Sequence, residues 1–266
     1  MAIQLNERDQ LIFKMIDEHQ VLLEKHISWF ISGEDKPVLI RDRLRKLFYL
    51  DYLLCQRHNT KLPWWTTPTK PLVYMLSPMS RQEAASDESN LDLLDSNVQR
   101  HFLEVANVRM LCLIAQKEGE ISEFEWRTCS PSLKKDSRLD AIIDFKMSAS
   151  SHKVGIINHP TDTEKLVSDL EVSFKEDSVE TILVVSRDDM HQKSLQQALS
   201  SKKGGIDLNK VLFVTHHELY KSGITKACWL KADQQATSLL GAPITALTEA
   251  VKWAPGFSGA PIASAM

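Results

Sequence analysis

Residues 37–50 have the sequence PVLIRDRLRKLFYL, which places four cationic side chains among regularly spaced apolar ones. The cations are Arg41, Arg43, Arg45 and Lys46. The apolar residues Val38, Leu39, Leu44, Leu47, Phe48 and Leu50 recur at roughly helical spacing. This pattern predicts one amphipathic helix with a buried apolar stripe and a basic outer face. We expect the four cations to contact DNA.

Two shorter helices are predicted before this basic helix. Asn6 stands three positions before Asp9 and ahead of a helical apolar pattern, which predicts a capped helix from about residue 7 to about residue 19. A second apolar pattern predicts a helix from about residue 22 to residue 30, and the polar residues 32–35 end it. Three short helices with tight turns, the third one basic, follow the order of a helix-turn-helix.

A hairpin is predicted directly after the basic helix. Residues 52–56 and 72–76 have the composition of strands, and the segment between them is rich in Pro, Thr, Lys and Trp. This order is typical of a winged helix-turn-helix, which we expect over residues 1–79. The hairpin cations expected to reach DNA are Arg57, His58, Lys61 and Lys70, beside Trp64 and Trp65. The alternative is a solvated charged face, with both tryptophans packed back on the domain or on a partner.

The charge of the chain is unevenly distributed. The formal net charge is −3, yet residues 41–70 carry seven Lys or Arg and two acids, whereas residues 80–97 carry five acids and one Arg. A local basic patch on a mildly acidic protein is compatible with sequence-selective DNA binding. We interpret residues 80–97 as an acidic linker between two domains. A role in dimerisation is the rival interpretation.

Composition also excludes several classes of protein. The four cysteines are widely spread and form no C-x-x-C pair, so neither a zinc site nor a disulfide framework is indicated. No signal sequence is recognisable, and no apolar run approaches the roughly 20 residues that span a bilayer. We expect a cytoplasmic protein that has no membrane partner and needs no cofactor.

The second half of the chain alternates strand and helix patterns. A buried helix is expected over residues 101–119. Three strands follow at 123–126, 139–145 and 153–158, then a helix at 163–175, a strand at 181–186, a helix at 189–201 and a strand at 210–215. Strands that form a meander and then alternate with helices predict a mixed sheet covered by helices, an α/β (α+β) domain over residues 98–230. Residues 231–266, rich in Ala, Gly, Pro and Ser, are expected to form a partly flexible tail.

This order of elements is shared by the restriction-endonuclease-like nucleases. Their chemistry needs carboxylates on neighbouring strands that hold Mg²⁺ or Mn²⁺, together with a nearby lysine. Asp140 occupies the first of these places, but residues 156–159 provide no acid on the next strand. An active nuclease would therefore depend on Asp140 as metal ligand, with Glu104 or Glu125 and with Lys146 or Lys153. The site lacks its second acid, and we favour a domain without catalytic activity.

Six segments of the chain resemble the replication-relaxation family of plasmid and mobile-element proteins. They are LNERDQLIFKMIDEHQVLLEKHISWF (5–30), RDRLRKLFYLDYL (41–53), VYMLSP (73–78), HFLEVANVRM (101–110), SRLDAIIDF (137–145) and TDTEKL (161–166). The resemblance, over about 180 residues in pieces, implies a winged helix followed by a nuclease-like domain. Relatives tend to carry an acid where this chain has residues 157–159, so the chain departs from them at its second acid. His216-His217 with Tyr220 could suggest a relaxase, but we interpret it as an exposed strand end.

Three functions remain as hypotheses. The first is a DNA-binding protein that acts in relaxation, replication, mobilisation or transcriptional control of a plasmid or mobile element. Its expected partners are double-stranded DNA, a second copy of the chain, and mobilisation or replication proteins. The second hypothesis is a metal-dependent DNA nickase. The third is a transcriptional repressor whose second domain senses a small molecule.

Overall fold

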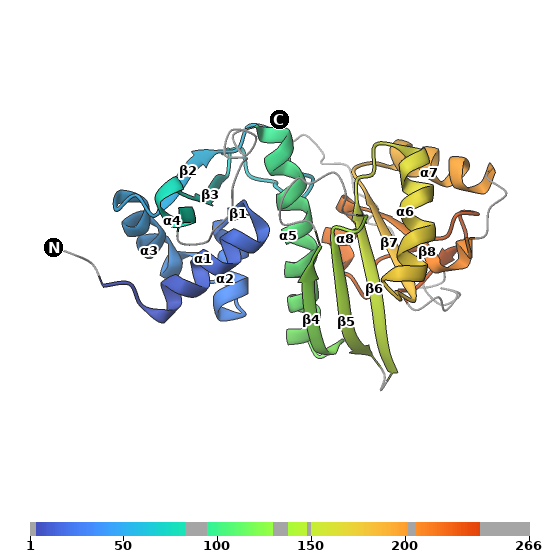
Figure 1. Cartoon of the computed structure of the whole chain (residues 1–266), viewed down its shortest axis with the longest axis horizontal. Coiled ribbons are helices and arrows are strands. Elements are labelled where there is room, and N and C mark those ends of the chain that lie inside the picture. Colours follow the sequence, from blue (N-terminus) through green and yellow to red (C-terminus); the bar gives the residue numbers. More distant parts are fainter. Residues whose placement is uncertain (1–3, 83–94, 130–137, 148–149, 202–205, 240–266) are drawn as a thin grey trace, which may run out of the picture.

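The computed structural model describes residues 4–82, 95–129, 138–147, 150–201 and 206–239. The fold is mixed α/β, as the sequence predicted, with a three-stranded antiparallel sheet and a seven-stranded mixed sheet. Helix α5 (Ser96–Lys117) lies between the two sheets (Figure 1). Within the described ranges, no helix has both the length and the apolar character needed to cross a bilayer.

The N-terminal unit (residues 4–82) begins with a capped helix. Its elements are α1 (Glu7–His19), β1 (Leu22–Leu23), α2 (Glu24–Ser32), α3 (Pro37–Tyr49), β2 (Leu53–Arg57), β3 (Leu72–Leu76) and α4 (Pro78–Gln82). The Asp9 N–H donates to the Asn6 side chain at 3.0 Å, and the Asn6 N–H donates to the Asp9 carboxylate at 2.9 Å. The bounds predicted for the first helix are confirmed.

The start of the second helix was predicted two residues too early. Leu22 and Leu23 form the short strand β1, which pairs antiparallel with Tyr74 and Val73 of β3. Both leucines are buried. A strand of two buried residues has no alternating pattern, so its side chains were counted as part of the helical stripe that follows.

The predicted apolar stripe of α3 was only partly correct. Ile40, Leu44 and Leu47 are the buried side chains of this helix, at intervals of four and three residues. Val38 and Leu39 are instead 67% and 63% exposed. A stripe that passes through positions 40, 44 and 47 leaves positions 38 and 39 on the opposite side, so the outer face of α3 is apolar as well as basic.

Helix α5 is buried on several sides and joins the two halves of the molecule. Residues 83–94 of the expected linker lie outside the described residues. The helix begins at Ser96, inside the range expected for the linker, and the Asn97 N–H donates to the capping side chain of Asp95 at 2.6 Å. The helix contacts α1, α2 and β1 on one side and β4 (Ser122–Thr128) and β6 (Ser150–Asn158) on the other. Two distinct cores therefore meet on one helix.

The C-terminal unit (residues 95–239, with the gaps given above) contains the large sheet. Its further elements are β5 (Ala141–Met147), α6 (Thr163–Glu176), β7 (Thr181–Ser186), α7 (Asp189–Ser201), the 3₁₀ turn Leu208–Lys210, β8 (Val211–Thr215), α8 (His216–Ser222), β9 (Trp229–Leu230) and β10 (Ala236–Thr237). The strand order is β10-β9-β8-β7-β6-β5-β4. The order from β4 to β6 is an antiparallel meander, and β6, β7 and β8 run parallel.

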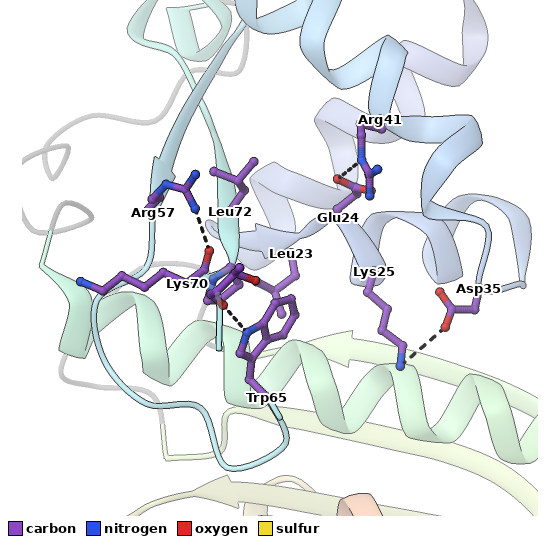
Figure 2. Close-up of a pocket in the computed structure, with 11 residues that line it drawn as sticks. Leu23, Glu24, Lys25, Asp35, Arg41, Arg57, Trp65, Lys70 and Leu72 are labelled. Atoms are coloured by element: carbon purple, nitrogen blue, oxygen red, sulfur yellow. Dashed lines mark hydrogen bonds and ion pairs between the residues drawn. The ribbon is translucent and has the colours of Figure 1, made fainter. Parts of the chain in front are cut away.

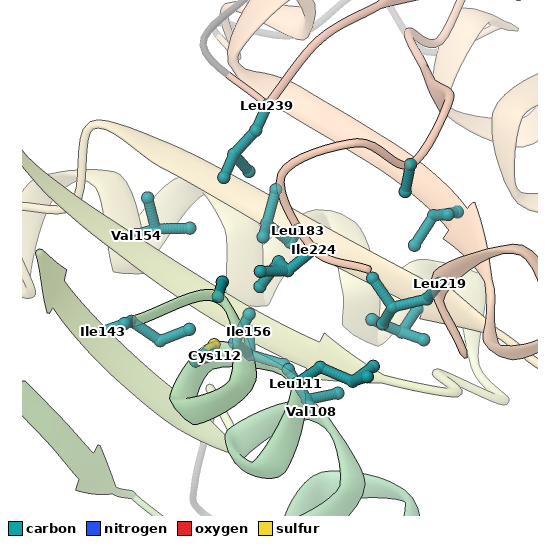
Figure 3. Packing of buried hydrophobic residues seen from close by; sticks show 14 of the residues in the cluster. Val108, Leu111, Cys112, Ile143, Val154, Ile156, Leu183, Leu219, Ile224 and Leu239 are labelled. Atoms are coloured by element: carbon teal, nitrogen blue, oxygen red, sulfur yellow. The ribbon is translucent and has the colours of Figure 1, made fainter. Parts of the chain in front are cut away.

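Each face of this sheet has its own apolar core. Val108, Leu111 and Cys112 of α5 pack against Ile156 of β6 and Leu183 of β7 on one face (Figure 3). Helices α6 and α7 provide the core of the other face. Because the strands carry apolar residues on both sides, the central ones are buried throughout, as expected for parallel strands between helices.

The sheet extends beyond the boundary that we expected at residue 230. Strands β9 and β10 pair across it, with Trp229 opposite Thr237 and Leu230 opposite Ala236. Leu239 is 3% exposed and belongs to the core on the α5 face. Residues 231–239 are therefore part of the folded unit. The tail predicted beyond them, residues 240–266, lies outside the described residues.

Candidate functional site

The outer face of α3 carries three of the four cations predicted to contact DNA. Arg41, Arg45 and Lys46 are exposed. The Arg45 side chain is 60% exposed and lies 3.7 Å from the carboxylate of Asp42, one turn earlier in the helix. Arg41 is half exposed and forms an ion pair with Glu24 of α2 at 2.9 Å. The pair of Arg45 with Asp42 is exposed on both sides and contributes little to stability, so Arg45 can exchange its acid for a phosphate at small cost. Glu24 is only 15% exposed and holds Arg41 more firmly.

Arg43 has a different role from the one that the sequence suggested. Its guanidinium forms two bonds to Asp9, one from Nε to Oδ1 at 2.6 Å and one from Nη2 to Oδ2. Asp9 is fully buried. Burial opposes the ionisation of Asp9, but the hydrogen bonds from Arg43 and from the Asn6 N–H, together with the positive charge of Arg43, outweigh that cost, and the pKa of Asp9 is lowered. Arg43 therefore neutralises a buried carboxylate inside the N-terminal unit, and its prediction as a DNA contact is corrected.

The four residues of the hairpin that were predicted to contact DNA differ in how exposed they are. Arg57, Lys61 and Lys70 are exposed. His58 is only 1% exposed, and its Nδ1 lies 3.1 Å from the Gln99 side chain of α5. It therefore joins the hairpin to α5, and its prediction as a DNA contact is corrected. Trp64, 5% exposed, also packs inward, as the alternative interpretation held.

A groove runs between the hairpin and the helices α2 and α3. Its free volume is about 480 Å³. Leu23, Arg41, Arg57, Trp65, Lys70 and Leu72 are among the residues that line it. Figure 2 shows Trp65, Arg57 and Lys70 on the hairpin side and Glu24 and Arg41 on the helical side. We call this feature the hairpin groove.

A second polar cluster lies in the C-terminal unit, where α5 meets the ends of the central strands. Asn158 at the end of β6 connects the two acids predicted for a nuclease site. Its side-chain Nδ2 donates to Glu104 at 3.0 Å, and its backbone N–H donates to Asp140 at 2.6 Å. His101 contacts Asp140 at 2.9 Å. The structure thus brings Glu104 and Asp140 together in one cluster.

Protein cations surround Glu104 in this cluster. The Nε atoms of Arg100 and Arg187 donate to its carboxylate at 2.8 and 3.0 Å, and its side chain is fully buried. Burial would raise the pKa of Glu104, but His216 and Arg187, together with hydrogen bonds from Asn158 and Arg100, outweigh that effect and lower it to about 2. The charge that a metal ion would contribute is therefore already supplied by arginine.

Histidines complete the cluster. His216 lies at the start of a helix and is fully buried, rather than exposed at a strand end as predicted. Its Nε2 is 2.6 Å from Asn158 Oδ1, and burial lowers its pKa to about 4. His101 behaves oppositely: burial disfavours its charge, but the Asp140 carboxylate outweighs that cost and raises its pKa.

The predicted catalytic lysines lie away from Asp140. Lys146 is six residues further along β5, roughly 20 Å at the usual rise of a strand, and binds Glu123 at 2.5 Å. Lys153 pairs in register with Asp144, and its Nζ donates to the backbone oxygen of Asp177 at 2.7 Å. Glu125 also pairs with Asp144. Lys146, Lys153 and Glu125 thus gather around Asp144, whereas Asp140 lines a separate pocket with His101 and Asn158. The predicted combination of these residues with Asp140 is therefore corrected.

The cluster does not fit Mg²⁺ or Mn²⁺. Both oxygens of Glu104 accept hydrogen bonds from side chains, and both oxygens of Asp140 are engaged by His101 and the Asn158 N–H. An octahedral Mg²⁺ needs carboxylate oxygens directed at an open position. In the described part of the chain, no group of three or more His, Cys, Asp or Glu residues is arranged to hold a metal ion.

Sequence reasoning missed the two arginines that determine the chemistry of this cluster. Arg100 was detectable, because it stands four residues before Glu104 on the same helix, the spacing of an ion pair. Arg187 directly follows β7 and reaches Glu104 only through the fold. Nothing in the local sequence relates residues 83 positions apart.

Comparisons with known proteins give no independent evidence of function. No protein-family model, curated protein or solved structure matches the chain. The resemblance to the replication-relaxation family therefore stays a prediction, which rests on the six segments quoted above.

Proposed function

We propose that the chain binds double-stranded DNA through its N-terminal unit, acting as a winged helix-turn-helix. The order helix, strand, helix, helix, strand, strand supports this proposal, as does the small sheet β1-β3-β2. In such a unit the third helix enters the major groove and the hairpin contacts the backbone. Here α3 and the β2–β3 hairpin hold those places.

The observation that carries the proposal is the chemistry of the outer face of α3. Arg45 and Lys46 are exposed there, next to exposed apolar side chains at Leu39 and Tyr49. Arginine and lysine bind guanine edges and phosphates, and apolar side chains contact the thymine methyl group. A helix face that combines both kinds of side chain suits the major groove better than it suits water.

The buried cluster supports a non-catalytic C-terminal unit in this proposal. Arg100 and Arg187 pair with Glu104, the acid that a nuclease would use, and Asn158 stands where the second acid would be expected. We therefore assign the C-terminal unit to stability and partner contact. Together with the resemblance, this reading leads us to propose a role in DNA relaxation, replication, mobilisation or transcriptional control of a plasmid or mobile element.

Fluorescence anisotropy with labelled duplexes tests the proposal. We expect Arg45→Ala to weaken binding by about 1–3 kcal/mol if the arginine reads a base, and Lys46→Ala to weaken binding to all sequences alike. Lys226→Ala is the control, because its side chain is also highly exposed, at 65%, but lies on the C-terminal unit. Equal affinities for all three variants and the natural chain would contradict the proposal.

A further inference from the structure

We propose that the hairpin groove binds an unpaired nucleotide, so that the preferred ligand is a duplex continued by a single strand. The inference rests on the proposed duplex binding and names the form of DNA that the site takes. Three features of the hairpin groove support the inference: a fixed aromatic ring, positive charge that no acid in the described part of the chain neutralises, and a volume too small for a duplex.

The aromatic ring is Trp65, in the loop between β2 and β3. Its indole Nε1 donates to the backbone oxygen of Thr69 at 2.7 Å, and its backbone N–H donates to the oxygen of Leu62 at 3.1 Å. The indole nitrogen and the backbone of Trp65 are therefore both held in place, while the ring remains partly exposed in the groove. A ring fixed in advance loses little conformational entropy when a base stacks on it.

Positive charge is concentrated on the same side of the groove. The acids on the helical side are already paired, Glu24 with Arg41 and Asp35 with Lys25. Arg57 and Lys70 instead contact neutral groups, the Lys70 backbone oxygen and the Asn59 amide. Among the described residues, neither forms an ion pair with an acid. Two cations beside an aromatic ring are the combination with which proteins hold single-stranded nucleic acid.

The size of the groove decides between paired and unpaired DNA. A free volume of about 480 Å³ falls in the range of about 300–1,000 Å³ that holds small ligands, so it admits a nucleotide but not a double helix. Bases inside a duplex have both faces stacked on their neighbours, so away from the duplex ends only an unpaired base can stack on Trp65.

Arg41 connects this groove with the proposed duplex interface. It belongs to the outer face of α3 and also lines the groove, opposite Arg57 and Lys70 (Figure 2). A strand that leaves a duplex bound on α3 would pass this guanidinium and enter between the cations of the hairpin. The two sites therefore form one continuous path for a phosphate backbone.

The test compares the affinity of the full chain for three labelled ligands by fluorescence anisotropy. These are a blunt duplex, the same duplex with a four-nucleotide thymidine tail at its 3′ or 5′ end, and that tailed duplex with abasic tail sugars. We expect the thymidine tail of one polarity to increase affinity about tenfold, within the range known for base stacking, and the abasic tail to lose most of the gain.

Variants locate the effect in the groove. Trp65→Ala is expected to bring the ratio of tailed-duplex to blunt-duplex affinity, measured within that variant, close to one, and Trp65→Phe is expected to retain most of the gain. Arg45→Ala is expected to weaken blunt and tailed duplexes by the same factor. The thermal midpoint of each variant controls for folding, and the abasic comparison needs no variant.

Each outcome separates this inference from the proposed function. Blunt-duplex binding without a gain from either tail, or a gain that persists in Trp65→Ala or with the abasic tail, overturns the inference alone. Binding of the tailed duplex but not of the blunt duplex supports the groove and contradicts the proposed duplex binding. Absence of binding to every ligand overturns both.

Discussion

The arginines of α3 differ in what each can do, although they are two residues apart. Arg45 points to solvent, with its side chain 60% exposed, whereas Arg43 is 20% exposed and pairs with Asp9, which is buried. Charge in the sequence is the same at both positions. The difference arises from helix geometry, which turns one side chain toward α1 and the other away from it.

Replacing Arg43 therefore tests a structural role. Arg43→Ala leaves the Asp9 carboxylate buried without its partner, which is expected to lower the free energy of unfolding by about 3 kcal/mol. Urea unfolding measures this loss. Arg45→Ala is the matched control and is expected to change stability by less than about 0.5 kcal/mol. A stable Arg43→Ala variant with weakened DNA binding would instead support the role that the sequence suggested.

Among the elements, helix α5 contacts the helices of the N-terminal unit on one side and the large sheet on the other. Leu103 and Phe102 face the cluster of the N-terminal unit, and Val108 and Leu111 face the large sheet. Such a helix shows no single apolar stripe, because apolar side chains are needed all round it. An ion pair from Arg109 of α5 to Glu18 of α1, at 2.9 Å, adds to the junction.

Two leucine substitutions compare the interior of α5 with the surface of α3. Leu103 is fully buried and Leu39 is 63% exposed. Leu103→Ala is expected to cost about 2–5 kcal/mol, because it opens a cavity between α5 and the hairpin. Leu39→Ala is expected to cost less than about 0.5 kcal/mol. Urea unfolding of both variants measures the difference, and similar values for the two would contradict the packing described for α5.

The sequence predicted long periodic elements well and short or tertiary features poorly. The bounds of α1, β7 and α7 were predicted correctly, because caps and apolar patterns mark their ends locally. The two-residue strands β1 and β9 leave no such pattern, and they form only because a partner strand lies beside them. For the same reason Glu104 and Asp140 were recognisable as acids, whereas Arg187 was not recognisable as their neighbour.

At the scale of the whole molecule, buried polar contacts join the two units, in addition to α5. The ring of Trp64 lies 5.6 Å from the ring of His216, centroid to centroid, which connects the hairpin loop with the polar cluster of the C-terminal unit. Thr128 of β4 donates to Glu18 of α1 at 3.0 Å. These contacts favour unfolding of both units in one transition.

Buried neutral histidines make the whole molecule sensitive to acid. Burial lowers the pKa of His26 to about 3 and those of His159 and His216 to about 4, below the usual value near 6.5. At pH values between the lowered pKa and 6.5, the unfolded chain binds more protons than the folded one. The stability that these neutral histidines contribute is therefore complete above pH 6.5 and is lost as the pH falls toward 4. The raised pKa of His101 acts oppositely, because its contribution is complete below pH 6.5 and is lost at higher pH.

Urea unfolding at several pH values checks this sign. We expect the free energy of unfolding to fall between pH 6.5 and pH 5, by at most about 1.4 kcal/mol per pH unit for each neutral histidine. His216→Gln removes one of the titrating groups and is expected to reduce the slope. A free energy that stays level or rises over this interval would show that these histidines are not held neutral in the folded chain.

The salt dependence of duplex binding tests the central proposal most directly. Each phosphate contact that is lost makes the plot of log affinity against log salt concentration less steep by about 0.9. We therefore expect the natural chain to show a steep negative slope and the Arg45→Ala/Lys46→Ala double variant to show a slope lower in magnitude by about 1 to 2. A slope equal in the two proteins, or no salt-dependent binding of the natural chain to any duplex, would contradict DNA binding through α3.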